Sequence, residues 1–133
     1  MPAAPLTEKG RTYLPVYSSV MAGGGRTRID FAVTLSIHNT SAALPLVLSR
    51  IDYFDTAGRV IQRYLDKPVA VRPYGSVQIV VAQSDTRGGL AANFVIDWES
   101  TARIDEPAIE AVMVSSYGAQ GYSFLSQGRR VSR

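Results

Sequence analysis

The stretch Val77-Gln-Ile-Val-Val-Ala-Gln-Ser-Asp-Thr-Arg-Gly-Gly-Leu-Ala-Ala-Asn-Phe-Val-Ile-Asp-Trp-Glu99 contains two alternating runs on either side of one glycine-bearing turn. The apolar residues of each run share one parity: Val77, Ile79 and Val81 before the turn, and Phe94, Ile96 and Trp98 after it. Successive side chains of a strand point to opposite faces, so each run offers an apolar face to a common core. We therefore predict a central β-hairpin here.

Similar patterns occur in the rest of the chain. Alternation is nearly uninterrupted from Ile29 to Ile37, and the runs 46–54 and 59–65 form a second predicted hairpin in which Gly58 supplies the positive φ of the turn. Short strands with turn signals at this spacing predict an all-β fold, a single antiparallel, immunoglobulin-like β-sandwich of about seven to eight strands. The inward parity predicts these core residues: Phe31, Val33, Leu35, Tyr53, Ile79, Val81, Phe94, Ile96 and Trp98.

Residues 105–114 are compatible with two structures. Asp105 followed by Pro107 is typical of a helix start. The alternation of Ile109, Ala111 and Met113 favours a strand instead, and we expect the strand. Residues 118–121 then predict a turn into a last strand, 122–127.

The length and charge distribution indicate one domain with two distinct ends. A chain of 133 residues with 46% hydrophobic content can bury one core. We predict a disordered or draping arm over 1–11, the β-sandwich domain over 12–127 and a basic tail over 128–133. The three arginines of that tail account for the whole excess of basic over acidic residues, 14 against 11, so the body lacks the basic face that nucleic-acid binding requires.

Several kinds of chemistry lack the residues they need. There is no cysteine, which excludes disulfides and thiolate ligands, and His38 is the only histidine. A zinc site would need three carboxylates beside this one imidazole. We therefore predict no metal site, no cofactor and no catalytic residue, and expect His38 to be a solvent-facing strand residue.

Two acidic residues on the last run are the first binding candidates. Asp97 and Glu99 share one strand face, roughly 7 Å apart from the strand rise alone. Such a pair can do acid–base work or hold a hard cation. It can also be solubilising charge with Arg50, Arg63 or Lys67 as its cross-strand partner.

The turn 84–89 supplies the other candidates. Asp85 and Thr86 can bond turn amides, and Gly88 with Gly89 allows a backbone path that other residues cannot follow, so the motif is suited to shaping a hairpin. A turn has no need for Arg87. This arginine forms either a buried ion pair, with Asp85 or Asp97, or a bidentate site for a ligand carboxylate or phosphate. The predicted binding residues are Asp85, Arg87, Asn93, Asp97 and Glu99.

Several segments together resemble one protein family. They are 13–18, Tyr-Leu-Pro-Val-Tyr-Ser; 35–40, Leu-Ser-Ile-His-Asn-Thr; 51–58, Ile-Asp-Tyr-Phe-Asp-Thr-Ala-Gly; 64–68, Tyr-Leu-Asp-Lys-Pro; 85–89, Asp-Thr-Arg-Gly-Gly, with 92–94 and Trp98; and 106–107 with 110–113. The combination resembles a bacterial envelope protein family of unknown function, the domain of unknown function family 3124. The resemblance implies an exported, often lipid-anchored, periplasmic or envelope-associated protein whose leader peptide is absent from this chain, and it implies no activity.

Two functional hypotheses follow. The favoured one is a non-enzymatic periplasmic binding or protein-interaction module whose partner is an envelope protein, a glycan or a small ligand. The basic tail or a removed lipid anchor would then add peripheral membrane contact. The alternative is a hydrolase or cation-dependent enzyme that uses Asp85, Asp97 and Glu99, with His38. Convergence of the acids in a cleft would favour the enzyme, and separated acids on a convex sheet would favour the module.

Overall fold

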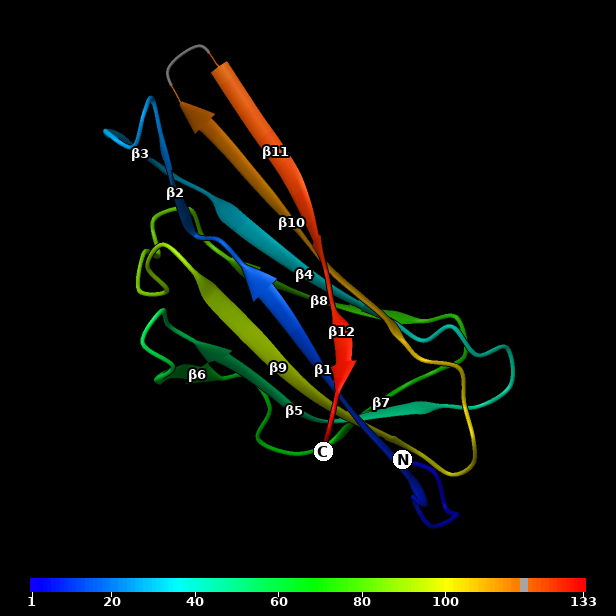
Figure 1. The fold of residues 1–133 in the computed structure, drawn as a ribbon. Coiled ribbons are helices and arrows are strands. Elements are labelled where there is room, and N and C mark those ends of the chain that lie inside the picture. The colour runs from blue at the N-terminus through cyan, green and yellow to red at the C-terminus, as the bar shows by residue number, and fades with distance from the viewer. Residues whose placement is uncertain (118–119) are drawn as a thin grey trace.

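The computed structural model describes residues 1–117 and 120–133, and this part of the chain is built from strands joined by loops (Figure 1). The twelve strands are β1 (Glu8–Val16), β2 (Ser19–Ala22), β3 (Thr27–Asp30), β4 (Ala32–His38), β5 (Leu46–Phe54), β6 (Val60–Arg63), β7 (Val69–Val71), β8 (Ser76–Val81), β9 (Ala92–Ser100), β10 (Ala108–Tyr117), β11 (Gln120–Gln127) and β12 (Arg129–Val131). The strand expected within 105–114 is therefore confirmed as part of β10. Gly118 and Ala119 of the predicted turn 118–121 lie outside the described residues.

The strands form two antiparallel sheets that face each other. A six-stranded sheet has the order β12-β1-β9-β5-β6, with β7 also pairing with β5, and a four-stranded sheet has the order β11-β10-β4-β8. The short pair β2-β3 stands apart from both. The predicted all-β antiparallel sandwich is confirmed, although its strands are more numerous than expected.

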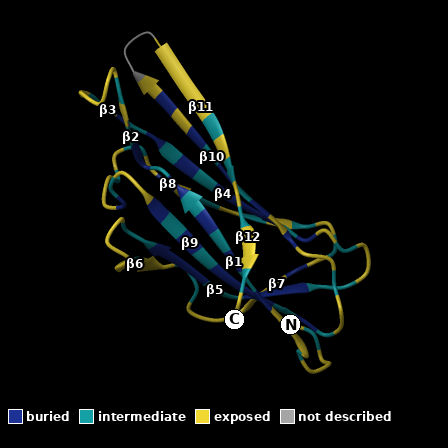
Figure 2. Cartoon of the chain, in the orientation of Figure 1, coloured by how far each residue is buried: buried dark blue, intermediate teal, exposed yellow. Residues whose placement is uncertain are grey.

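The core lies between the two sheets (Figure 2). Every predicted core residue is buried except Ile79, which is half-buried on the edge strand β8 and packs against the core. Trp98, Tyr53, Phe31 and Phe94 are the largest fully buried side chains. The inward parity of the alternating runs was therefore predicted correctly.

The predicted central hairpin is wrong. β8 is the edge of the four-stranded sheet and pairs with β4, whereas β9 is central in the six-stranded sheet between β1 and β5. Both runs turn their apolar faces to the same core, but from opposite sides. Their connection crosses from one sheet to the other, and alternation alone cannot distinguish this crossing from a hairpin.

Both ends of the chain are more ordered than predicted. β1 begins at Glu8, so the last four residues of the predicted 1–11 arm belong to a strand, and Arg11 pairs with Asp97. In the tail 128–133, β12 extends the six-stranded sheet by pairing with Arg11 to Tyr13 of β1. Arg133 contacts Glu99. The second predicted hairpin is confirmed as β5-β6, with Gly58 at φ 81°.

Candidate functional site

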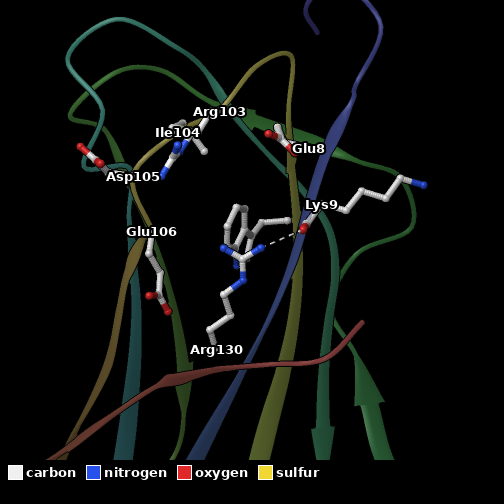
Figure 3. Close-up of a pocket in the computed structure, with 8 residues that line it drawn as sticks. Glu8, Lys9, Arg103, Ile104, Asp105, Glu106 and Arg130 are labelled. Carbon is white, nitrogen blue, oxygen red and sulfur yellow. Dashed lines mark hydrogen bonds between the residues drawn. The ribbon is translucent and has the colours of Figure 1, made fainter.

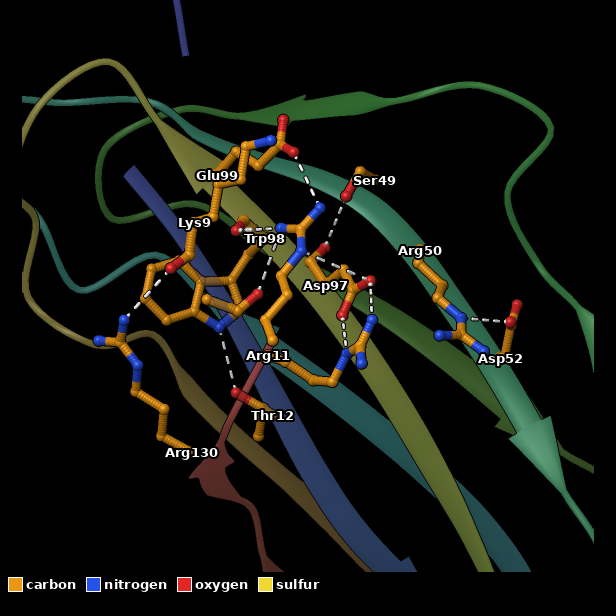
Figure 4. A network of polar contacts seen from close by, with 12 residues as sticks. Lys9, Arg11, Thr12, Ser49, Arg50, Asp52, Asp97, Trp98, Glu99 and Arg130 are labelled. Atoms are coloured by element: carbon orange, nitrogen blue, oxygen red, sulfur yellow. Dashed lines mark hydrogen bonds and ion pairs between the residues drawn. The ribbon is translucent and has the colours of Figure 1, made fainter. Parts of the chain in front are cut away.

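Asp97 lies on the outer face of the six-stranded sheet, opposite Arg11 of the neighbouring strand (Figure 4). Arg11 donates two parallel hydrogen bonds, Nε to Oδ1 at 2.6 Å and Nη2 to Oδ2 at 2.9 Å. The carboxylate side chain is only 7% exposed. This bidentate geometry holds Asp97 in place and occupies both of its oxygens.

The other charged groups on this face are paired as well. Arg133 donates to Glu99 at 2.9 Å and approaches Asp97 at 3.8 Å, so one guanidinium joins the two predicted acids. Arg50 lies next to them and binds Asp52 at 2.5 Å. The predicted partners Arg63 and Lys67 do not pair with the acids of β9: Arg63 approaches Asp52 at 3.9 Å, and no ion pair of the described residues includes Lys67. The pair Asp97 and Glu99 is part of an ion-pair network.

The electrostatics of Asp97 oppose a role in proton transfer. Burial alone would raise the pKa of Asp97, but the hydrogen bonds and charge of Arg11, with the charges of Arg133 and Arg50, outweigh burial and hold it below its ordinary value. A general acid at neutral pH needs a raised carboxyl pKa. Asp97 is instead an anion at neutral pH whose charge is already neutralised by arginines.

Asp85 and Arg87 lie in the loop between β8 and β9. Arg87 donates to both carboxylate oxygens of Asp85, at 2.9 and 2.8 Å, and to Gln62 Oε1 at 3.0 Å. The Arg87 side chain is 52% exposed, so the predicted ion pair with Asp85 forms at the surface and is not buried. The hydrogen bond from Arg87 is the main cause that lowers the pKa of Asp85.

The two glycines of this loop are explained by close approaches. A Cβ on Gly88 would lie 2.3 Å from the hydroxyl of the buried Tyr53. Gly89 has φ 76°, and a Cβ there would lie 2.7 Å from Thr56 Oγ1. Thr56 also donates to the Gly88 carbonyl and accepts from Ala91 N–H, which ties the loop to the six-stranded sheet. The backbone role predicted for these glycines is therefore present, in a crossing loop.

The predicted binding residues do not form one site. Asp97 lies five residues beyond the start of β9 at Ala92, roughly 17 Å along the strand. Asp85 precedes that start and is bound by Arg87, which also donates to Gln62. Asn93 lies between Pro15 and Phe54 in the sheet register, nearer the loop end. Within 1–117 and 120–133, no group of three or more His, Cys, Asp and Glu side chains is placed to hold a metal ion. His38 is half-buried opposite Ser76 and Ala108.

A pocket of 510 Å³ opens beside Trp98, where sequence analysis assigned no function (Figure 3). Trp98 Nε1 donates to Thr12 at 3.2 Å. Its ring lies so close to Gly10 that a Cβ there would lie 2.2 Å from the indole. The Arg130 guanidinium stands 5.0 Å from the ring centroid and donates to the Lys9 carbonyl at 3.2 Å. No sequence signal pointed to Arg130, because it falls in the segment interpreted as a tail.

The β11 edge is the second feature that sequence analysis missed. β11 pairs with β10 on one side, and none of the described strands pairs with its other edge. Residues 111–128 contain no Asp, Glu, Lys or Arg, which is a signal visible in the sequence. A row of three aliphatic residues and one threonine crosses the outer face of this sheet by register: Val80, Thr34, Val112 and Leu125. Val80 is 63% exposed and Leu125 62% exposed.

The fold and these surfaces define a two-sheet antiparallel sandwich with one ion-paired face and one face that is uncharged apart from Glu110, hereafter the uncharged face. Over residues 9–131 the chain matches the family model described as protein of unknown function (DUF3124), and it belongs to that family. The curated proteins contain no match. The chain is similar to the crystal structure of Thermotoga maritima 1070, with 12% identity, 90% of this chain and 92% of that chain covered, and a TM-score of 0.52. This likeness shows the fold alone. Among the described residues, no helix is long and apolar enough to cross a membrane.

Proposed function

We propose that the protein is a non-enzymatic interaction module of the bacterial envelope that binds an extended, uncharged strand of another envelope protein along the free edge of β11. The observation that carries the proposal is this edge, eight residues long with the sequence Gln-Gly-Tyr-Ser-Phe-Leu-Ser-Gln. An unpaired edge strand presents N–H and C=O groups that can pair with another strand. The partner strand supplies the missing backbone bonds.

Protection of the edges differs between the two sheets. The outer strands of the six-stranded sheet are short: β12 has three residues and two arginines, and β6 has four residues, an arginine and an irregular register with β5. Short length, charge and bulges are the features by which proteins prevent edge pairing. β11 has none of them, and no proline.

Side chains beside the edge add apolar contact. Leu125 and Val114 are 62% and 50% exposed on the outer face next to the edge, and Tyr122 is 42% exposed. Charged residues are depleted at the centre of protein interfaces and tyrosine is enriched there. The chemistry of the surface therefore suits an uncharged partner strand with apolar side chains on alternate positions.

The test compares three proteins: the unaltered chain, Ser123→Lys on β11 and Gln78→Lys on β8. Both residues are exposed, and β8 is the other uncharged edge of the same sheet. Each protein is used to capture partners from an envelope fraction, and backbone amide exchange is measured on the purified complex. We expect slower exchange in 120–127 within the complex, recovery at least tenfold lower for Ser123→Lys and unchanged recovery for Gln78→Lys.

Three outcomes would overturn the proposal. They are equal recovery with Ser123→Lys, protection of β8 in place of β11, and a β11-dependent dimer of this chain by light scattering, which would make the partner a second copy. Envelope location is tested separately by fractionation of cells that express the protein from its own gene. Recovery only in the soluble cytosolic fraction would remove the envelope part of the proposal.

The alternative enzyme has no comparable observation in its favour. Asp97 and Glu99 are held by Arg11 and Arg133, and Asp85 is held by Arg87 at the far end of the sheet. An acid–base or cation site requires carboxylates that face a shared cleft. These carboxylates face arginines.

A further inference from the structure

We infer that the pocket beside Trp98 binds a small zwitterion, an amino acid or short peptide, whose carboxylate pairs with Arg130. This site is separate from the β11 edge, and the inference does not rest on the proposed function. Its residues come from β1, β9, β12 and the loop before β10, so three strands of the six-stranded sheet and one crossing loop build it.

The floor of the pocket is rigid. The Trp98 indole is 1% exposed, bonded to Thr12 through its N–H and pressed against the backbone of Gly10. Gly10 and Trp98 are directly opposite in the β1-β9 register, so the missing side chain of one makes room for the ring of the other. The ring therefore offers a fixed surface on which a planar cation can stack.

The Arg130 guanidinium lies against the Trp98 ring and uses only part of its hydrogen-bonding capacity. Its guanidinium is held by the ring and by the single hydrogen bond to the Lys9 carbonyl. A guanidinium has five N–H donors, and no carboxylate of the described residues lies within ion-pair distance of Arg130. Arg11 and Arg133 on the same sheet are both paired with acids. Arg130 is therefore a preorganised guanidinium that can donate two parallel hydrogen bonds to a ligand carboxylate.

The remaining lining residues define the rest of the ligand. Lys9 contributes its carbonyl, and its side chain extends away from Arg130 (Figure 3). Arg103 adds a second cation to the lining, and Glu8, Asp105 and Glu106 add three carboxylates, so the lining residues carry charges of both signs. A polyanion such as a phosphate ester would meet three like charges. A ligand with one carboxylate and one ammonium group finds a partner for each. The volume of 510 Å³ admits an amino acid or dipeptide.

The test uses the only tryptophan of the chain as its reporter. Alanyl-alanine is titrated into the protein while Trp98 emission is recorded, and the N-acetylated dipeptide and the dipeptide amide are titrated in parallel. We expect a saturable change with the free dipeptide, at least tenfold weaker binding with the amide and a smaller loss with the acetylated form. Inorganic phosphate should give no saturable change.

Two variants test whether the change in Trp98 emission comes from binding at Arg130. Arg130→Gln removes the guanidinium, and Arg129→Gln is its matched control, an exposed arginine on the same strand that does not line the pocket. We expect at least tenfold weaker binding for the first and unchanged binding for the second, with thermal melting confirming that both fold. Absence of a saturable change with the dipeptide, equal binding by Arg130→Gln, or tighter binding of phosphate would overturn the inference.

Discussion

The outer faces of the two sheets have opposite chemistry. On the six-stranded sheet, Arg11, Asp97, Arg133 and Glu99 form a network of paired charges. On the four-stranded sheet, Glu110 is the only Asp, Glu, Lys or Arg in all of β4, β8, β10 and β11. The charged residues predicted from the sequence to bind a ligand form ion pairs within the protein in the structure. The sheet without charged motifs is the one that has a long edge strand without charges or bulges, β11, and it exposes Val80, Val114 and Leu125.

This difference shows that a charged residue type is a weak guide to a binding site when its ion-pair partners within the protein are unknown. A carboxylate bound bidentately by arginine has its hydrogen-bonding capacity filled within the protein. A strand edge has unfilled capacity in its backbone, whatever its side chains are. Variants in the two sheets can measure how far the six-stranded sheet depends on its buried and paired groups, and how far the uncharged face tolerates change.

The largest expected effect is that of Trp98→Ala. The side chain is 1% exposed and joins β1, β9 and β12 through Thr12, Gly10 and Arg130. Its removal should lower the free energy of unfolding by about 3 to 5 kcal/mol, because a large cavity remains in the core. Denaturant unfolding measures the change, with Val80→Ala, 63% exposed on the uncharged face, as control. A similar loss of unfolding free energy for both variants would contradict the difference in burial between Trp98 and Val80.

Truncation after Gln127 comes next. Residues 128–133 were interpreted from the sequence as a basic tail outside the sandwich domain, but removing them deletes β12, the Arg130 stack on Trp98 and the Arg133 pair with Glu99. The summed loss of a cation–π contact and charged hydrogen bonds should cost about 2 to 4 kcal/mol. A chain ending after Val131 keeps β12 and should lose less. Equal thermal melting of the full and truncated chains would show that β12 and its contacts do not stabilise the sandwich.

A smaller effect is expected for Asp97→Asn. Losing the charge that Arg11 binds should cost about 2 kcal/mol near neutral pH. On the uncharged face, Glu110→Gln should change stability by less than about 0.5 kcal/mol, because no ion pair of the described residues includes Glu110. Denaturant unfolding of both variants beside the parent gives the comparison.

The pH dependence sharpens this comparison. The folded-state pKa of Asp97 lies below its ordinary value, so the unfolded state binds the proton first as pH falls. The stabilisation by Asp97 should therefore be complete above about pH 4 and decline below it, as the pH passes through the folded-state pKa. The difference between parent and Asp97→Asn should shrink in that range. A difference that stays constant down to pH 2 would show that the Arg11 pair does not stabilise the fold.

Much of the fold was predictable from local pattern. The alternating runs determined which residues are buried, because a strand turns every second side chain toward the core, and Phe31, Phe94 and Trp98 are buried as expected. The glycine at position 58 indicated a tight turn, and its φ of 81° confirms the reason. Family membership was also visible in the sequence, because short segments along most of the chain resemble the family that residues 9–131 match.

Only the tertiary structure decided which strands pair and which charges meet. The periodicity of β8 and β9 is the same for a hairpin and for two strands that face one core from opposite sheets, so the pairing partner cannot be derived from it. Arg11 and Asp97 are 86 residues apart in sequence, and Arg133 reaches Glu99 from the last position. Local sequence specifies the direction of each side chain, whereas long-range pairing depends on how all strands together bury their apolar faces.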